Sequence, residues 1–214
     1  MAKAKKKQAA SSRNLTSRQG KDFVLKKAQE DGVKFIRLWF CDTLGLLKSF
    51  AITIDELAEA MDKGKFFDGS AIESFARNEE SDMRALPDPS TFQVLPWRPK
   101  ENAVARMFAD IVDNNGVPFD GDPRQCLKRN LKKASDLGYT FYVGPEIEFF
   151  YFQNSESTKT LDQGGYFDLT SLDAGSDLRR ETVLTLEEMG IGVESSHHEA
   201  APSQHEIDLR YTDA

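Results

Sequence analysis

Short stretches of alternating apolar and polar residues recur through the first half of the chain, and each predicts a β-strand. The stretches are rich in Val, Ile, Phe and Trp and are separated by turn-forming residues. The predicted strands are residues 33–41, 46–52, 91–97 and 103–112. Segments with helical spacing lie between them, so this half is expected to form a small sheet covered by helices.

Two helices are predicted in this half. Residues 22–31 carry apolar side chains on one helical face and are followed by a glycine. Thr53 and Glu56 have the spacing of a capping box, which predicts a helix from Thr53 to about Met61. Segment 66–90 combines glycine and prolines with several aromatic residues, so we interpret it as an ordered, functional loop.

The second half of the chain predicts a separate domain. Asp122 and Pro123 have the pattern of a helix cap followed by a first-turn proline, and they predict a helix that ends at Gly138. An aromatic strand, an amphipathic helix and a return to strand character follow at residues 139–152, 177–189 and 191–210. We therefore predict an α+β chain made of a basic, disordered tail and two domains, at residues 1–20, 21–117 and 118–214.

Charge is distributed unevenly along the chain, whose net charge is -7. The first 21 residues contain seven basic side chains and no acidic one, and they lack the apolar core of a signal peptide. We interpret this tail as a solvated extension. The strongly acidic remainder argues against nucleic acid as the main partner and is compatible with a protein that collects cations.

Membrane insertion and disulfide bonding are not expected. The apolar stretches fall far short of the roughly 20 residues that a membrane span needs. The two cysteines, Cys41 and Cys126, form neither a disulfide framework nor a metal motif, and Cys41 is expected to be buried and inert. A soluble, cytoplasmic protein in a reducing compartment is predicted.

Two carboxylates in the second domain have a spacing that suggests metal binding. Glu146 and Glu148 stand two residues apart in a predicted strand, so alternation places both on one face, about 7 Å apart. Like charges this close among aromatic residues are unfavourable unless a cation or protons intervene. The alternative is two solvated carboxylates on an exposed face.

Glu199 and Glu206 strengthen the metal interpretation. A two-residue turn at Pro202-Ser203 would place Glu199 opposite Glu206, about 5 Å apart on one face. Four inward carboxylates favour a hard divalent cation, Mg²⁺ or Mn²⁺, over zinc. The three histidines of this region, at positions 197, 198 and 205, are interpreted as hydrogen-bonding neighbours rather than ligands. No glycine-rich phosphate loop is present, since Gly164-Gly165 is an isolated pair.

Five motifs together resemble the glutamine synthetase family, of the bacterial and archaeal type. They occur in the family's order and spacing over roughly residues 22–214. The motifs are Phe67-Asp-Gly-Ser70, Glu80-Ser-Asp-Met83, Gly144-Pro-Glu-Ile-Glu-Phe-Phe150, Gly165-Tyr-Phe-Asp168 and His197-His-Glu-Ala-Ala-Pro-Ser-Gln-His-Glu-Ile-Asp208. The resemblance implies a small β-grasp-like N-terminal domain followed by the beginning of a catalytic domain.

The resemblance implies an ATP-dependent ligation of ammonia to L-glutamate through γ-glutamyl phosphate. In this interpretation Glu148, Glu199 and Glu206 hold one Mg²⁺ or Mn²⁺ ion. Glu146 holds a second ion together with residues from later in the family's chain. ATP is the co-substrate, and the ions offset charge on the transferring phosphoryl group.

Three further residues are assigned by the resemblance. Asp68 matches an aspartate that a neighbouring subunit contributes and that helps to deprotonate ammonium, and Tyr166 matches a position lining the same site. Glu194 matches a nucleotide-contacting glutamate, although strand parity places it on the face away from Glu199. The chain departs from the family pattern at Ala71, Ser74 and Ser203, where serine, glycine and glycine are usual.

The resemblance also implies a homo-oligomer, a dodecamer of two rings with active sites between neighbours, and no membrane or nucleic-acid partner. The family's second half supplies further metal ligands and substrate-binding arginines, which are not among these 214 residues. We therefore expect a fragment of a synthetase that is inactive by itself. Two alternatives are a short, non-catalytic relative that assembles with a full-length enzyme, and a ligase that glutamylates another amine.

Overall fold

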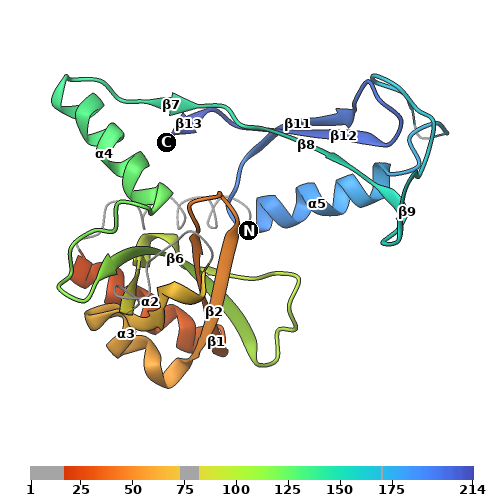
Figure 1. The fold of residues 1–214 in the computed structure, drawn as a ribbon. Coiled ribbons are helices and arrows are strands. Elements are labelled where there is room, and N and C mark those ends of the chain that lie inside the picture. The colour runs from red at the N-terminus through yellow and green to blue at the C-terminus, as the bar shows by residue number, and fades with distance from the viewer. Residues whose placement is uncertain (1–16, 73–81, 170) are drawn as a thin grey trace. The chain divides into compact units, whose positions relative to one another are not determined.

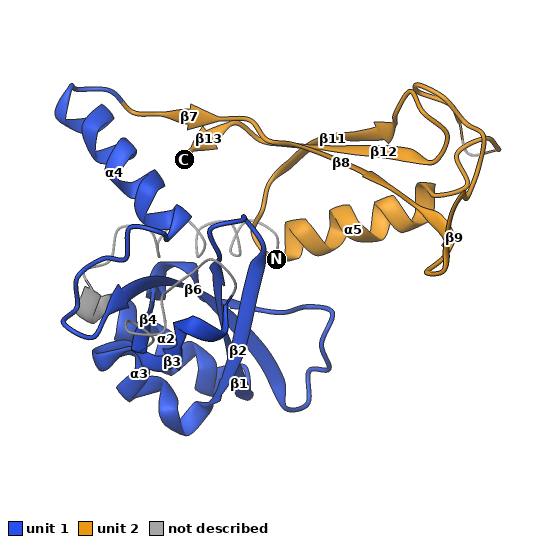
Figure 2. Cartoon of the chain, viewed as in Figure 1, with its two compact units in different colours: residues 1–139 blue, residues 140–214 orange. Residues whose placement is uncertain are grey.

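The computed structural model describes residues 17–72, 82–169 and 171–214. It divides into two compact units, residues 1–139 and 140–214 (Figure 2). In the described residues each unit combines sheet with at least one helix, which confirms the predicted α+β class. Among the described residues, no helix is both long and apolar enough to cross a membrane.

The first unit is built on one mixed sheet of six strands (Figure 1). Along the sheet the order is β2-β1-β6-β4-β3, and β5 pairs with β6. Strands β1 and β6 run parallel, and the other pairs are antiparallel. The strands are β1 (Val33–Cys41), β2 (Leu47–Thr53), β3 (Lys65–Asp68), β4 (Asp82–Pro87), β5 (Gln93–Val94) and β6 (Ala103–Asp113).

The helices of the first unit are α2 (Ser17–Glu30), α3 (Leu57–Lys63) and α4 (Pro123–Asp136), with 3-10 turns η1 (Ile54–Glu56), η2 (Gly69–Ala71) and η4 (Pro89–Thr91). The hydrophobic core lies between one face of the sheet and the helices α2 and α3. Apolar side chains reach it from alternate residues of the strands and from every third or fourth residue of the helices. Its fully buried members include Val24, Ala28, Ile36, Leu38, Leu57, Met107 and Ile111.

Several sequence predictions for this unit are confirmed. The strand predicted at 33–41 has the same bounds in the structure. The one predicted at 46–52 is displaced by one residue, and the one predicted at 103–112 ends one residue later. Asp122 caps α4: its carboxylate accepts from the backbone N–H of Arg124 at 2.9 Å and of Ile111 at 3.0 Å. The second of these bonds attaches the start of α4 to strand β6.

Other predictions for this unit are wrong at the level of single elements. The helix predicted at 22–31 begins at Ser17, so residues 17–20 are helical instead of part of a disordered tail, and residues 1–16 lie outside the described part. Thr53 makes no capping hydrogen bond, and a 3-10 turn precedes α3. Of the predicted strand 91–97, only Gln93–Val94 pairs as a strand.

Segment 66–90 is not one loop, because β3 and β4 pair within it. Short strands such as β3 carry too few residues for their alternation to stand out from the surrounding loop. Residues 73–81 lie outside the described part, and with them Ser74 and the first two residues of the Glu80–Met83 motif. Cys41 is half-buried rather than buried, and burial together with nearby carboxylates raises the pKa of its thiol.

The second unit contains a three-stranded antiparallel sheet, ordered β11-β12-β8, and two small strand pairs. The predicted long strand 139–152 is divided where Gly144-Pro145 interrupts it. The elements are β7 (Tyr142–Val143), β8 (Glu146–Phe150), β9 (Phe152–Asn154), β10 (Ser157–Thr160), α5 (Ser176–Glu188), β11 (Val193–His198), β12 (Gln204–Leu209) and β13 (Thr212–Asp213). The predicted helix 177–189 is thus confirmed as α5.

Candidate metal-binding site

The three-stranded sheet brings together the carboxylates of β8 and β12. Glu148 lies opposite Glu206, and Glu146 lies opposite Asp208. Because side chains alternate across a strand, these four project from the same face of the sheet. Asp208 had no assigned role in the sequence analysis, although its spacing of two from Glu206 is the same signal that identified Glu146 and Glu148.

The predicted hairpin register between β11 and β12 is wrong. His197, and not Glu199, lies opposite Glu206, and the backbone N–H of Glu199 donates to the carbonyl of Gln204 at 2.8 Å. The favoured two-residue hairpin turns need a positive φ at their first central position, which the proline ring of Pro202 forbids. The loop is therefore longer, with Ser203 at φ 59°.

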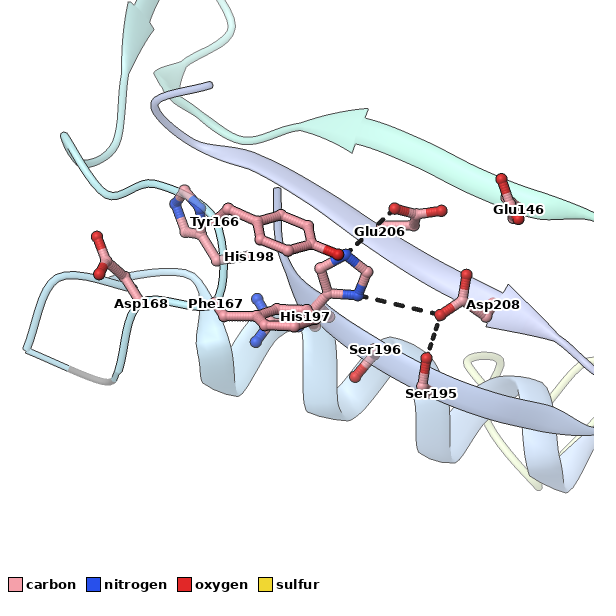
Figure 3. Close-up of a pocket in the computed structure, with 11 residues that line it drawn as sticks. Glu146, Tyr166, Phe167, Asp168, Ser195, Ser196, His197, His198, Glu206 and Asp208 are labelled. Carbon is pink, nitrogen blue, oxygen red and sulfur yellow. Dashed lines mark hydrogen bonds and ion pairs between the residues drawn. The ribbon is translucent and has the colours of Figure 1, made fainter. Parts of the chain in front are cut away.

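Glu199 nevertheless reaches Glu206, by way of a histidine. The Nε2 atom of His197 lies 3.2 Å from a carboxylate oxygen of Glu199 and 3.2 Å from one of Glu206. Its Nδ1 atom lies 4.0 Å from Asp208 (Figure 3). The rings of Tyr166 and Phe167 stack on each other and meet the His197 ring edge-on.

A cavity of about 620 Å³ opens over this face (Figure 3). Tyr166, Phe167 and Asp168 line it from one loop. The sheet contributes Glu146, Ser195, Ser196, His197, His198, Glu206 and Asp208, and α5 contributes Arg179. Three of the seven predicted site residues, Glu146, Tyr166 and Glu206, therefore line one cavity.

Within the described residues there are three groups of possible ligands, and two of them lie on the carboxylate-bearing face of the sheet and share one member. His197, Glu199 and Glu206 form the first group, and Glu146, Glu206 and Asp208 form the second. In each group the ligand atoms lie within 4.8 Å of one another. Glu206 therefore occupies the position between the two groups.

The electrostatics of Glu206 fit a cation site. Burial, followed by the charge of Asp208 and the hydrogen bond shared with Glu199, raises the pKa of Glu206 to about 7. The pKa of Glu199 is lowered, chiefly because its carboxylate accepts from the backbone N–H of Ala200. Without a cation, a proton on Glu206 thus offsets part of the negative charge here, and an oxygen-rich donor set of this kind suits Mg²⁺ or Mn²⁺.

The other predicted site residues lie outside these two groups. The carboxylate of Glu148 accepts from Nε2 of Gln204 at 2.7 Å. Glu194 is exposed, sits where the ladder register shifts between Val193 and Ser195, and does not line the cavity. The ligand role of Glu148 and the nucleotide role of Glu194 stay predictions.

Asp68 belongs to the first unit, at the end of β3. Its carboxylate accepts from the backbone N–H of Ser70 at 2.9 Å and from its hydroxyl at 2.6 Å. These two bonds lower the pKa of Asp68, so the exposed side chain is a carboxylate at neutral pH. Ala71 follows in the same turn and is exposed.

Beneath the metal-binding face, two further histidines are buried and held by charged partners. His198 contacts Asp162 and the Glu199 carbonyl, which outweigh the effect of burial and raise the pKa of His198. Arg179 donates to Nδ1 of His205 at 2.6 Å, and burial and this cation lower the pKa of His205. Both make hydrogen bonds here, and with Asp162 they also form a third group of possible ligands, so the expectation that they are not ligands stays a prediction.

The metal-free chain is expected to lose stability as the pH rises through about 7. Glu206 keeps its proton up to this pH in the folded chain, whereas its ordinary pKa is 4.5. The folded state therefore binds more protons across this window, and the free energy of unfolding falls as the pH rises. The unfolding temperature should fall more steeply with rising pH in the wild type than in Glu206→Gln. Parallel pH profiles of the two proteins would contradict the assignment.

Comparison with known proteins identifies related sequences and folds. The family model described as glutamine synthetase, beta-Grasp domain, matches residues 32–114, and the one described as glutamine synthetase, catalytic domain, matches residues 120–214. The glutamine synthetase of Methanosarcina mazei is 51% identical over 197 residues, covering 90% of this chain and 44% of that protein. That of Mycolicibacterium smegmatis is 54% identical over 200 residues, covering 91% and 45%.

Solved structures show the same fold. The complex of GmaS with ADP has a TM-score of 0.79 and 27% identity, covering 89% of this chain and 44% of that one. The Plasmodium falciparum glutamine synthetase has a TM-score of 0.79 and 23% identity, covering 93% and 45%, and supports the fold alone. The chain therefore spans a little under half the length of these relatives. The β-grasp domain and the beginning of a catalytic domain are confirmed as its fold.

Proposed function

The chain belongs to the glutamine synthetase family, and from this premise we propose that it supplies the N-terminal half of an ATP-dependent glutamate–ammonia ligase. The reaction joins ammonia to L-glutamate through γ-glutamyl phosphate and yields glutamine, ADP and phosphate. We call the protein in which this chain is joined to the rest of the catalytic domain the complete synthetase.

One observation carries this proposal beyond family membership: Glu206 belongs to both ligand groups at one cavity. Phosphoryl transfer relies on positioning and on cations that offset charge on the transferring group. Two Mg²⁺ or Mn²⁺ ions are proposed, one held by His197, Glu199 and Glu206 and one by Glu146, Glu206 and Asp208. His197 is thus proposed as a ligand, although the sequence favoured a hydrogen-bonding neighbour at this position. Glu148 could join the first group by releasing Gln204.

The protein's own groups would bind and orient the substrates. The carboxylates on the sheet keep the cavity negative, so that only cation-bound nucleotide enters favourably. The stacked rings of Tyr166 and Phe167 exclude water from one side of His197. Asp68 attracts ammonium as a carboxylate and accepts its proton. Glu194 would contact the nucleotide outside the cavity.

Assembly and location complete the proposal. We propose a homo-oligomer, dodecameric in the complete synthetase, in which Asp68 of one subunit serves the cavity of a neighbour. This arrangement would explain why Asp68 and the metal-binding carboxylates belong to different compact units of the chain. A cytoplasmic location is supported by the two free cysteines.

A ligase that glutamylates another amine is the second candidate, and Ala71 favours it. The family usually has a serine at this position, beside the proposed ammonium site, and alanine removes the hydroxyl. An apolar methyl group there suits the alkyl part of an amine better than it suits ammonium. Turnover of the complete synthetase with ammonia and with methylamine or ethylamine distinguishes the two activities.

The 214-residue chain alone is expected to bind Mn²⁺ but to make no glutamine from glutamate, ammonia and ATP. Carboxylates for metal binding are present, whereas the arginines that hold glutamate and phosphate in the family come from the other half. Isothermal titration with Mn²⁺ and a coupled ADP assay on the purified chain check both parts. Glutamine formation by the chain free of host synthetase would contradict the proposal, as would a failure to bind Mn²⁺.

A further inference from the structure

One buried carboxylate, that of Asp162, connects the loop that lines the cavity with the loop that carries Glu199. The first loop, residues 161–174, carries Tyr166, and the second, residues 199–203, carries Glu199. The side chain of Asp162 is only 7% exposed. It belongs to neither β11 nor β12, and it does not line the cavity.

Asp162 holds the second loop through Ser203. Its Oδ1 atom accepts from the backbone N–H of Ser203 at 2.9 Å and from the Ser203 hydroxyl at 3.3 Å. In return the backbone N–H of Asp162 donates to the same hydroxyl at 2.7 Å. Ser203 is fully buried and has a φ of 59°, a conformation that costs a non-glycine residue about 1 kcal/mol or more. The hydroxyl bonds offset this cost, which gives serine a role where the family usually has glycine.

Asp162 also holds the residue before Glu199. Its Oδ1 atom lies 3.1 Å from Nε2 of His198, and Nδ1 of the same ring lies 2.7 Å from the carbonyl oxygen of Glu199. Both ring nitrogens thus face oxygen acceptors, one on each loop. The His198 ring is a rigid spacer between Asp162 and the peptide group of Glu199.

The approach of His198 to the first loop depends on a glycine. A Cβ atom on Gly164 would lie 2.8 Å from Nε2 of His198 and 2.7 Å from the carbonyl oxygen of Leu172. Gly164 therefore leaves room for the ring. Asp162 closes the same loop on itself by accepting from the backbone N–H groups of Gly164 at 3.2 Å and Ala174 at 3.0 Å.

We propose that Asp162 is a positioning residue for the metal-binding site, because its contacts with His198 and Ser203 set where the Glu199 carboxylate stands. This inference rests on the proposed function. Glu199 lies in the loop after β11, where its N–H still donates to the carbonyl of Gln204 and its carboxylate accepts from the Ala200 N–H. The Asp162 contacts add to these bonds by fixing the residues on either side of them. The Phe167 N–H donates to the His198 carbonyl at 3.1 Å, which attaches the Tyr166 loop to the same segment.

A double-mutant cycle with Glu199 tests the proposal, with Mn²⁺ alone as the probe of the chain. Asp162→Asn is expected to weaken Mn²⁺ binding about tenfold, because an amide cannot accept all the bonds that the carboxylate accepts. In a Glu199→Ala background the same substitution should change the affinity less than about twofold, since there is then no carboxylate to position. Asp177→Asn, an exposed aspartate in the first turn of α5, is the matched control and should bind like the wild type.

Ser203 variants distinguish an effect on the position of Glu199 from an effect on stability. They also test the proposal if Asp162→Asn fails to fold. Ser203→Ala and Ser203→Gly both remove the hydroxyl, but only glycine relieves the positive φ. Both should weaken Mn²⁺ binding by a similar factor of about three to ten, while Ser203→Gly unfolds at a higher temperature than Ser203→Ala. The proposal would be overturned if the Mn²⁺ affinities of the two Ser203 variants differed in the same order as their unfolding temperatures. It would also be overturned if Asp162→Asn weakened Mn²⁺ binding equally with and without the Glu199 carboxylate. Absence of Mn²⁺ binding in the wild type would instead overturn the proposed function.

Discussion

Glu206→Ala is expected to abolish glutamine synthesis by the complete synthetase, with a loss of about 1,000-fold or more in kcat. Glu206 is the one residue shared by the two described ligand groups, so its removal leaves each group with two protein ligands. Glu206→Gln should be almost as damaging, because the amide keeps the volume but not the negative charge. Steady-state rates at saturating Mg²⁺ or Mn²⁺ measure the loss, and isothermal titration with Mn²⁺ shows whether binding is lost too.

Glu188→Ala is the matched control for this experiment. Glu188 is an exposed glutamate at the end of α5 and lines no part of the cavity. Its replacement should leave both the rate and the metal affinity unchanged. Near-normal turnover by Glu206→Ala at saturating metal would remove Glu206 from the site and with it the shared-ligand arrangement.

Asp68→Asn is expected to lower glutamine synthesis by about 100-fold or more while leaving Mn²⁺ and ATP affinity almost unchanged. The asparagine can still accept from Ser70, so the local turn is preserved. What is lost is the negative charge that attracts ammonium and accepts its proton. The deficit should grow as the pH falls, because less free ammonia is then available to bypass the missing base. Rates measured against ammonium concentration at several pH values check this.

Asp88 offers a close structural control for Asp68. It also precedes a 3-10 turn, and it accepts from the backbone N–H and the hydroxyl of Ser90 at 2.9 and 2.6 Å. Asp88 additionally pairs with Arg124 at 2.6 Å. Asp88→Asn should therefore reduce thermal stability without changing the ammonium dependence. An ordinary ammonium dependence in Asp68→Asn would exclude Asp68 from catalysis.

Mixed oligomers test whether Asp68 serves a neighbouring subunit. Asp68→Asn and Glu199→Ala subunits are each expected to be inactive alone. Reassembled together, they should recover part of the activity, because some interfaces then join an intact Asp68 to an intact Glu199. Mass spectrometry verifies that mixed oligomers have formed. No recovery in such oligomers would contradict a site shared between subunits.

Features that depend on local geometry could be predicted from the residues alone. Strand β1 was predicted with its observed bounds, because alternation over nine residues has a period that no helix shares. The cap at Asp122 followed from its position directly before Pro123. That Glu146 and Glu148 share a face follows from strand pleating alone. The motifs also sufficed to identify the family, since matching residues in register carry information that does not require coordinates.

Which of these residues come into contact depends on how distant segments pack together. The pairing of His197 with Glu206 depends on the length of the loop at Pro202, and a change of loop length moves every partner along the ladder. Asp162 and Ser203 are 41 residues apart, and no periodicity connects them. Pleating and capping act between neighbours along the chain and can be read from it. Register and buried hydrogen bonds depend on segments that approach only when the whole sheet has formed, and for this reason the arrangement around Glu199 and Glu206 could not be predicted from their spacing.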